Sequence, residues 1–304
     1  MASGLPQPLD YDIIKAGWTY QYHRADPLYP FGHGLSYTKF AYSDLRLSSE
    51  TLAQDGAVDV SMTLTNTGTR PGSEVVQLYV RALNARYEAP RLRLTDFRKV
   101  ALPPGGSREL TFRLPAEHLA HWDVASGAFT VDPGGYEVLV GRSAGGITLT
   151  APVTVSGPAP APRIVVDRRT SAVDFDDHTG ITLLDATRTT GDAVAPANLD
   201  QPATLLFRSI DLSGAIRIEA EVTGAGPGQL EFLAGDRLLA EISVPFTGSR
   251  YAWTTVPGDL KTSSDGVHDL QVNLRGDVRL AAFRFGSARL RPPPEPSDQN
   301  LPFL

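Results

Sequence analysis

The chain has 304 residues, 41% hydrophobic and 20% charged, which is typical of globular proteins and long enough for two domains. Its net charge is −6, with no basic cluster that could follow a phosphate backbone, so we do not expect nucleic acid as a partner. No apolar stretch approaches the roughly 18 residues of a membrane span, and the first residues show no signal peptide, which leaves the localisation unknown. The absence of cysteine excludes disulfides and thiolate metal sites.

An aromatic-rich arm, residues 1–39, opens the chain. It has little apolar periodicity, and it contains Tyr11, Trp18, Tyr20, Tyr22, Tyr29, Phe31 and Tyr37. So many aromatic side chains must lie against another surface. One hypothesis is an arm packed on the next domain. The other, which we favour, is a linker whose proper partner surface is absent from this chain.

Residues 40–154 predict an antiparallel β-sandwich. Val60, Met62 and Leu64 alternate with polar residues, as in a half-buried strand. Turn-forming Gly, Pro, Asn and Asp residues recur between such runs, which indicates about seven short strands and a single helical turn over 115–122.

A second all-β domain is expected over 164–290, after a Pro/Ala linker at 155–163. Short alternating runs are separated by glycine-containing segments, which we interpret as turns, among them 224–228 and 275–277. The number of strands suits a jelly-roll sandwich. The Pro-rich tail, residues 291–304, is predicted to be disordered.

Few residues suggest chemistry. The acidic run Asp174–His178 could bind calcium or form a solvated turn. His118 and His121 have metal-ligand spacing on the predicted helical turn, but no further ligand accompanies them, so we interpret them as structural. No nucleophile or phosphate-binding motif occurs. The residues alone therefore support a binding or structural role with no catalytic or metal site.

Two motifs carry a resemblance to a known family. Residues 27–40, PLYPFGHGLSYTKF, resemble the segment that joins the α/β sandwich domain of family 3 glycoside hydrolases to their fibronectin type III-like domain. Residues 58–80 and 94–114 resemble that fibronectin type III-like domain itself. The resemblance covers about residues 5–145 and implies a family that hydrolyses β-glucosides or β-xylosides.

The resemblance also implies what this chain lacks. In that family, the nucleophilic Asp and the acid/base Glu lie in an N-terminal barrel and in the α/β sandwich domain. Both regions would precede residue 1, so the chain alone is expected to be inactive and the missing domains are its expected partners. Met1 falls where the sandwich domain would end, which suggests a fragment, a split gene product or a truncated reading frame.

Residues 170–288 resemble carbohydrate-binding modules of family 6, with VDFDDHTGI at 173–181 as the opening segment. Such modules stack a sugar between aromatic rings, so the expected ligand is a plant-type polysaccharide or oligosaccharide. The resemblance places Arg250 or Tyr251 nearest the stacking position, and Trp253 resembles a core tryptophan. We take all three as candidate carbohydrate-binding residues and expect Tyr251 and Trp253 to share one face of a strand.

The same resemblance shows two departures. Ala281 or Ala282 stands where an Asn is expected to assist sugar binding. Ser171 and Val173 replace acidic residues, which argues against the family's structural calcium, so no cofactor is expected.

Three hypotheses follow. The first is an accessory C-terminal segment of a family 3 glycoside hydrolase. The alternative is a stand-alone carbohydrate-binding β-sandwich protein, which would have no use for the arm. The third is a hydrolase with an unrecognised site.

Overall fold

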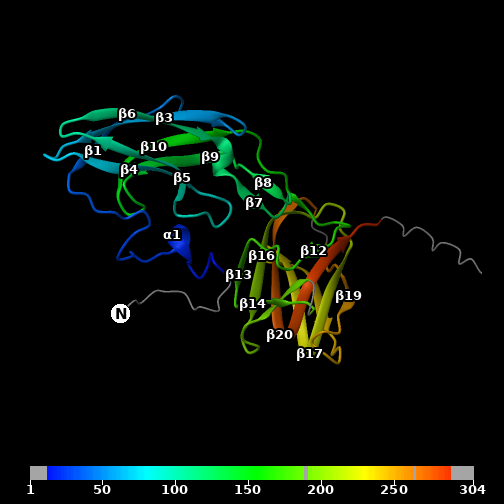
Figure 1. The fold of residues 1–304 in the computed structure, drawn as a ribbon. Coiled ribbons are helices and arrows are strands. Elements are labelled where there is room, and N and C mark those ends of the chain that lie inside the picture. The colour runs from blue at the N-terminus through cyan, green and yellow to red at the C-terminus, as the bar shows by residue number, and fades with distance from the viewer. Residues whose placement is uncertain (1–11, 188–190, 263–264, 289–304) are drawn as a thin grey trace, which may run out of the picture. The chain divides into compact units, whose positions relative to one another are not determined.

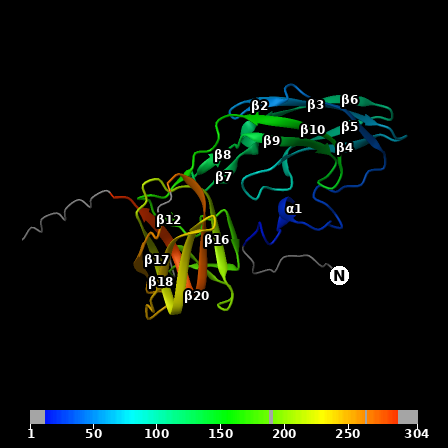
Figure 2. The same cartoon turned by 180° about the vertical axis from the view of Figure 1, so that it is seen from behind.

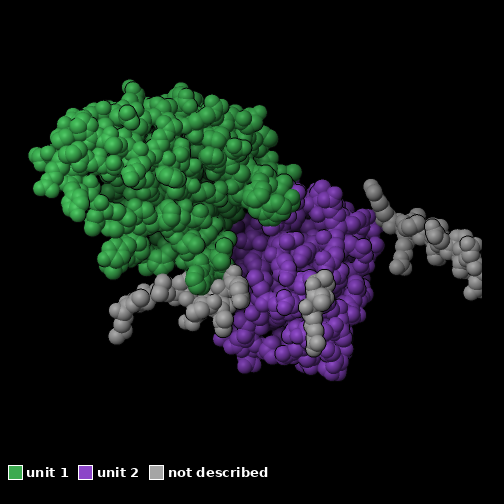
Figure 3. Space-filling view, viewed as in Figure 1, with its two compact units in different colours: residues 1–123, 127–161 green, residues 124–126, 162–304 purple. Residues whose placement is uncertain are grey.

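The computed structural model describes residues 12–187, 191–262 and 265–288, and nearly all of its elements are strands (Figure 1). This confirms the all-β prediction. The chain divides into two compact units, 1–161 without 124–126, and 162–304 together with 124–126 (Figure 3). The predicted disordered tail, residues 291–304, lies outside the described residues. No helix in the described part of the chain is long and apolar enough to cross a membrane.

The first unit is a sandwich of a three-stranded sheet, in the order β1-β3-β6, and a five-stranded sheet, in the order β2-β10-β9-β4-β5. A small β7–β8 hairpin accompanies them (Figure 1). The elements of this unit are α1 (Thr19–Tyr22), β1 (Phe40–Leu47), β2 (Thr51–Ala53), β3 (Ala57–Asn66), β4 (Gly72–Ala82), β5 (Arg93–Leu102), β6 (Ser107–Pro115), the 3₁₀ helix η1 (Ala116–Leu119), β7 (His121–Asp123), β8 (Ala128–Thr130), β9 (Gly134–Gly141) and β10 (Ile147–Ser156).

Strand β3 shows why this sequence folds as a sandwich. Val60, Met62 and Leu64 are buried, as their alternation predicted, and they join a core built from both sheets. On the opposite face, the hydroxyls of Ser61 and Thr111 lie 3.0 Å apart across β3 and β6. The period-two pattern therefore separates an apolar inner face from a polar outer one.

The turn after β3 is organised by a buried asparagine. The Asn66 side chain donates to the carbonyls of Arg70 (2.8 Å) and Leu102 (3.1 Å). Its Oδ1 accepts from the Thr38 hydroxyl at 2.7 Å and from the Gly68 amide at 3.1 Å. Because every polar atom of this amide has a partner, its burial costs little, and one side chain fixes both the turn and the end of the arm.

The second unit forms a branched ten-stranded sheet folded into two layers. Strands β17, β18 and β20 lie side by side within it (Figure 2). Its elements are β11 (Arg163–Ile164), β12 (Thr170–Ser171), β13 (Asp177–Thr179), β14 (Ile181–Asp185), β15 (Asp192–Pro196), β16 (Ala203–Asp211), β17 (Arg217–Ala234), β18 (Arg237–Val244), β19 (Thr254–Asp259) and β20 (Val267–Gly286).

Two long strands, β17 and β20, run through both layers as one bent ribbon. Their first and second halves pair with different neighbours: β19 with the first half of β17, and β18 with the second. The prediction of turns at 224–228 and 275–277 is therefore wrong, because both segments lie inside strands, at a bulge. A Cβ at Gly276, where φ is +74°, would lie 2.3 Å from the Pro227 carbonyl oxygen, so the bend requires glycine.

The core of the second unit is rich in phenylalanine. The Phe283 ring meets those of Phe207 and Phe232 edge to face, at centroid distances of 5.1 and 5.6 Å. These three rings are buried in the core, whereas the Phe246 side chain is exposed.

Candidate functional site

The three candidate carbohydrate-binding residues lie on one loop, residues 245–253, which joins β18 to β19 and is called here the binding loop. The loop is anchored by Thr223, which is fully buried at the bend of β17. The Thr223 hydroxyl contacts the Thr247 hydroxyl at 2.8 Å and donates to the Ser249 carbonyl at 2.7 Å. The Thr247 amide donates to the Gly224 carbonyl at 3.0 Å. These contacts hold the loop against a strand, which favours a preorganised surface.

The loop presents two aromatic rings to solvent. Phe246 is 68% exposed and Tyr251 is 60% exposed. Phe246 is not among the site residues predicted from the sequence. The signal that could have identified it is its place in the turn-rich segment PFTGS, directly after β18 ends at Val244.

Trp253 lies differently from our expectation. Strand β19 begins only at Thr254, so the prediction that Tyr251 and Trp253 share one face of a strand is wrong. Tyr251 points to solvent, whereas Trp253 is half-buried against Ala186, Ala193 and Ala281. Its indole N–H donates to the Ala186 carbonyl at 2.8 Å. The structure thus gives Trp253 a packing contact, and Ala281 is part of that contact.

Arginine side chains accompany the Tyr251 ring. The Arg279 guanidinium carbon lies 5.4 Å from the ring centroid, within cation–π distance. Arg250, exposed on the loop, pairs with the Asp277 carboxylate at 3.4 Å. No local pattern in the sequence points to Arg279, because only the pairing of β20 with β17 brings it beside the binding loop.

The acidic run at 174–178 does not fit a calcium site. The buried Arg163 guanidinium donates to the Asp174 carbonyl at 2.7 Å and lies 3.3 Å from the Asp176 carboxylate. Burial raises the pKa of the Asp174 carboxyl, which disfavours the charged form that a cation needs, although Arg163 and Arg169 oppose this. Within the described ranges, no group of three or more His, Asp or Glu residues could hold a metal ion.

The first unit contains a half-buried charge network around His121. Arg86 bridges the carboxylates of Asp123 (3.0 Å) and Asp132 (2.8 Å), and the His121 ring stacks on Tyr87 with centroids 3.7 Å apart. Burial lowers the pKa of the His121 imidazole, with the Asp132 carboxylate opposing and Arg86 reinforcing the shift. The network ties the loop after β4 to the β7–β8 hairpin, a structural role that matches our interpretation of this histidine.

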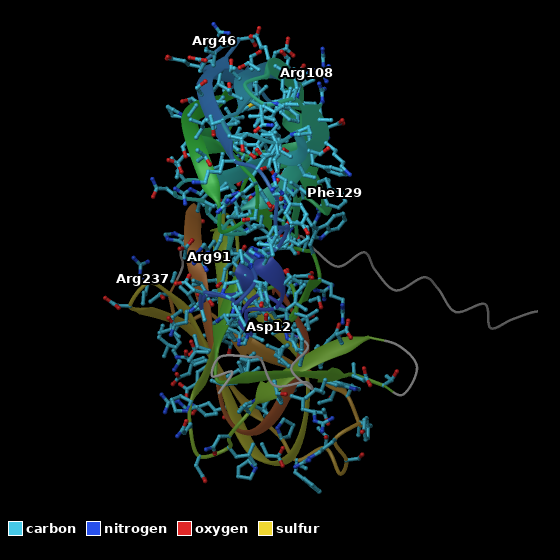
Figure 4. The ribbon with its side chains drawn as sticks, turned by 60° about the vertical axis from the view of Figure 1, so that its left-hand side comes forward. Asp12, Arg46, Arg91, Arg108, Phe129 and Arg237 are labelled. Carbon is cyan, nitrogen blue, oxygen red and sulfur yellow. The ribbon has the colours of Figure 1, made fainter. Side chains whose placement is uncertain are left out.

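The arm is docked on the first sandwich. The Tyr20 ring stacks on Phe31 with centroids 4.2 Å apart and meets Tyr79 of β4 edge-on. The Tyr20 hydroxyl accepts from the Leu94 amide at 3.1 Å. The Arg91 amide donates to Gln21 of α1 at 2.8 Å, and Figure 4 shows Arg91 beside that helix.

A glycine in the arm allows its closest approach to the sandwich. Gly32 has a φ of +77°, and a Cβ there would lie 2.4 Å from the Gln77 side-chain oxygen. Gln77 is buried, accepts from the Tyr79 hydroxyl and donates to the Arg142 carbonyl at 2.7 Å. The PFGHG motif therefore has a steric reason, because a Cβ at Gly32 would force either the arm or the buried, hydrogen-bonded Gln77 side chain to shift.

The arm also leaves apolar side chains uncovered. Leu35 and Tyr37 are each 94% exposed, Leu28 is 86% exposed and Tyr29 is 70% exposed. We call these four residues the exposed arm face. Large exposed apolar side chains so close together in sequence are a feature of interaction surfaces.

Comparison with known proteins assigns both units. Residues 74–144 match the fibronectin type III-like domain, and residues 171–287 match the carbohydrate binding module of family 6. The chain is 37% identical over 131 residues to thermostable β-glucosidase B of Acetivibrio thermocellus, covering 43% of this chain and 17% of the relative. It is 40% identical over 142 residues to a β-glucosidase of Rhizobium radiobacter, covering 46% and 17%.

A third relative is the xylan 1,4-β-xylosidase of Xylanibacter ruminicola, which is 38% identical over 140 residues, covering 46% of this chain and 15% of the relative. The chain thus spans less than a fifth of the length of these relatives. It combines a fibronectin type III-like domain, shared with β-glucosidases and β-xylosidases, with a family 6 carbohydrate-binding module.

Proposed function

We propose that this chain is the accessory C-terminal segment of a family 3 glycoside hydrolase that acts on β-glucosides or β-xylosides, and that the chain itself carries none of the catalytic residues. The observation that carries the proposal is the arm, which packs on the first sandwich through Tyr20 and Gly32 yet leaves Leu35 and Tyr37 uncovered. A stand-alone binding protein gains nothing from such a face. The exposed arm face would contact the preceding catalytic domains of the parent enzyme.

We further propose that the second unit binds a plant-type polysaccharide or oligosaccharide through Tyr251, Arg250 and Phe246. A rigid loop with exposed rings suits the apolar faces of sugar rings. The half-buried Trp253 supports that loop by packing and by its bond to Ala186.

A chimera tests the accessory role. Residues 12–161 of this chain would replace the matching stretch of the Acetivibrio thermocellus β-glucosidase. We expect the chimera to hydrolyse an aryl β-glucoside, whereas the same enzyme without that stretch should be unstable or inactive. Replacing Leu35 and Tyr37 with serine in the chimera should lower its melting temperature and activity. The Phe129→Ser variant, on the β7–β8 hairpin (Figure 4), is the matched control.

The purified chain should show no turnover of aryl β-glucosides or β-xylosides. A chimera no better than the truncated enzyme, or one indifferent to the Leu35 and Tyr37 substitutions, would favour the alternative of a stand-alone carbohydrate-binding protein. Turnover that stays with the purified chain through every step would instead reveal an active site of its own.

A further inference from the structure

One guanidinium group lies over an exposed phenol ring on the second unit, and a second belongs to the residue before that ring on the binding loop. Arg279 lies over the Tyr251 ring at 5.4 Å, and its Nη1 donates to the Arg250 carbonyl at 3.4 Å. The Arg250 side chain is itself 52% exposed. The binding loop therefore exposes the Arg250 side chain next in sequence to a ring that Arg279 covers.

The local charge is positive although the chain carries a net charge of −6. Asp277 balances Arg250 through a single contact at 3.4 Å, which leaves most of that guanidinium's donors unused. Within the part of the chain that the structure describes, Arg279 has no ion-pair partner. One positive charge is thus left without a counter-charge beside Tyr251.

The charged donors that remain at the loop are the guanidinium groups of Arg250 and Arg279, beside the Tyr251 hydroxyl and the Asp277 carboxylate that pairs with Arg250. The Thr247 hydroxyl and the Ser249 carbonyl are used within the anchor, and the Ser249 hydroxyl accepts from the Tyr251 amide at 3.2 Å. A guanidinium donates and never accepts. Neutral sugars present hydroxyls that both donate and accept, whereas a surface of guanidinium donors is matched best by a group that only accepts. Carboxylates and sulfates are such groups, and their pairing with arginine is charge-assisted.

We propose that the binding loop, with Arg279, binds saccharides that carry a carboxylate or sulfate group. The sugar ring lies against Tyr251 and the anionic group meets Arg250 and Arg279. The proposal rests on the proposed sugar-binding role of this loop and adds the chemical class of its ligand.

Titration calorimetry with the intact chain tests the proposal with matched ligands. Oligogalacturonate is compared with its methyl ester, which has the same sugars without the charge, and dextran sulfate is compared with dextran. We expect at least one charged ligand to bind about tenfold more tightly than its neutral partner, the lower end of what a charge-assisted hydrogen bond contributes. Which pair shows the difference separates carboxylate from sulfate recognition.

Variants locate the effect. Arg279→Gln and Arg250→Gln should each remove most of the preference for the charged ligand, whereas Asp277→Asn should strengthen binding by freeing Arg250. Arg237→Gln, at the β17–β18 turn (Figure 4), removes the same charge elsewhere on this unit and should leave the affinity unchanged.

Three results would overturn the inference. Equal affinity for charged and neutral ligands, abolished by Tyr251→Ala but not by the arginine variants, would leave a sugar site without charge selectivity. An equal loss in Arg237→Gln, or equally tight binding of a single-stranded oligonucleotide, would mean unspecific attraction of polyanions. If no saccharide of either kind binds, both the proposed sugar-binding role of the second unit and its proposed ligand class are wrong.

Discussion

Replacing Trp253 with alanine separates packing from binding in the second unit. The indole contacts a small cluster that includes Ala186 and Ala281 and donates one hydrogen bond to the Ala186 carbonyl. Truncating a fully buried tryptophan costs about 3–5 kcal/mol. Because this ring is only half-buried, we expect about 2–3 kcal/mol, of which about 1 kcal/mol is the lost hydrogen bond.

Calorimetry of the intact chain measures this loss, provided that the two units melt in separate transitions. In Trp253→Ala, the melting temperature of the second unit should fall by roughly 5–10 °C. Trp253→Phe keeps most of the packing and should lose only about 1 kcal/mol. Tyr251→Ala, which removes an exposed ring, should change stability by less than about 0.5 kcal/mol and yet abolish saccharide binding. A Trp253→Ala variant that melts like the parent chain but no longer binds saccharide would refute this reasoning, because the ring would then line the site.

Three further outcomes are expected. Gly32→Ala should make the arm more sensitive to protease, because the added methyl group meets Gln77 and the left-handed φ costs alanine about 1–2 kcal/mol. Gly34→Ala is the control, because a Cβ there meets no atom within 4 Å. Equal cleavage of the two variants would contradict this prediction. Burial lowers the pKa of His121 below 6.5, so the unfolded state binds more protons than the folded state. The unfolding free energy of the first unit, measured by urea titration, should therefore fall as the pH drops below about 6.5. The His121→Phe variant should flatten this pH dependence, and the same pH dependence in that variant would contradict the prediction. Limited proteolysis should cut first within 157–162, the part of the predicted linker between β10 and β11, and leave two resistant pieces; a first cut inside either unit would count against that linker.

The sequence by itself determined the fold class and most of the strands. In β3 the alternation of Val60 and Met62 with polar residues encodes which face is buried, and that information is local. The arm was also visible from its composition, because so many aromatic rings cannot remain in water. Composition does not show which arm side chains dock on the sandwich, such as Tyr20, and which remain exposed, such as Tyr37.

The tertiary structure alone decided the candidate site. Glycine signals a bent strand and a turn in the same way, so only the pairing of β17 with β20 shows that Gly276 bends a continuous ribbon. That pairing brings Arg279 beside Tyr251, although Arg279 lies on β20 and Tyr251 lies on the binding loop. The boundary of β19 at Thr254 then separates the outward Tyr251 from the inward Trp253. Local pattern fixes which residues are apolar or charged, whereas long-range pairing fixes which of them meet, because contacts between distant segments leave no period in the sequence.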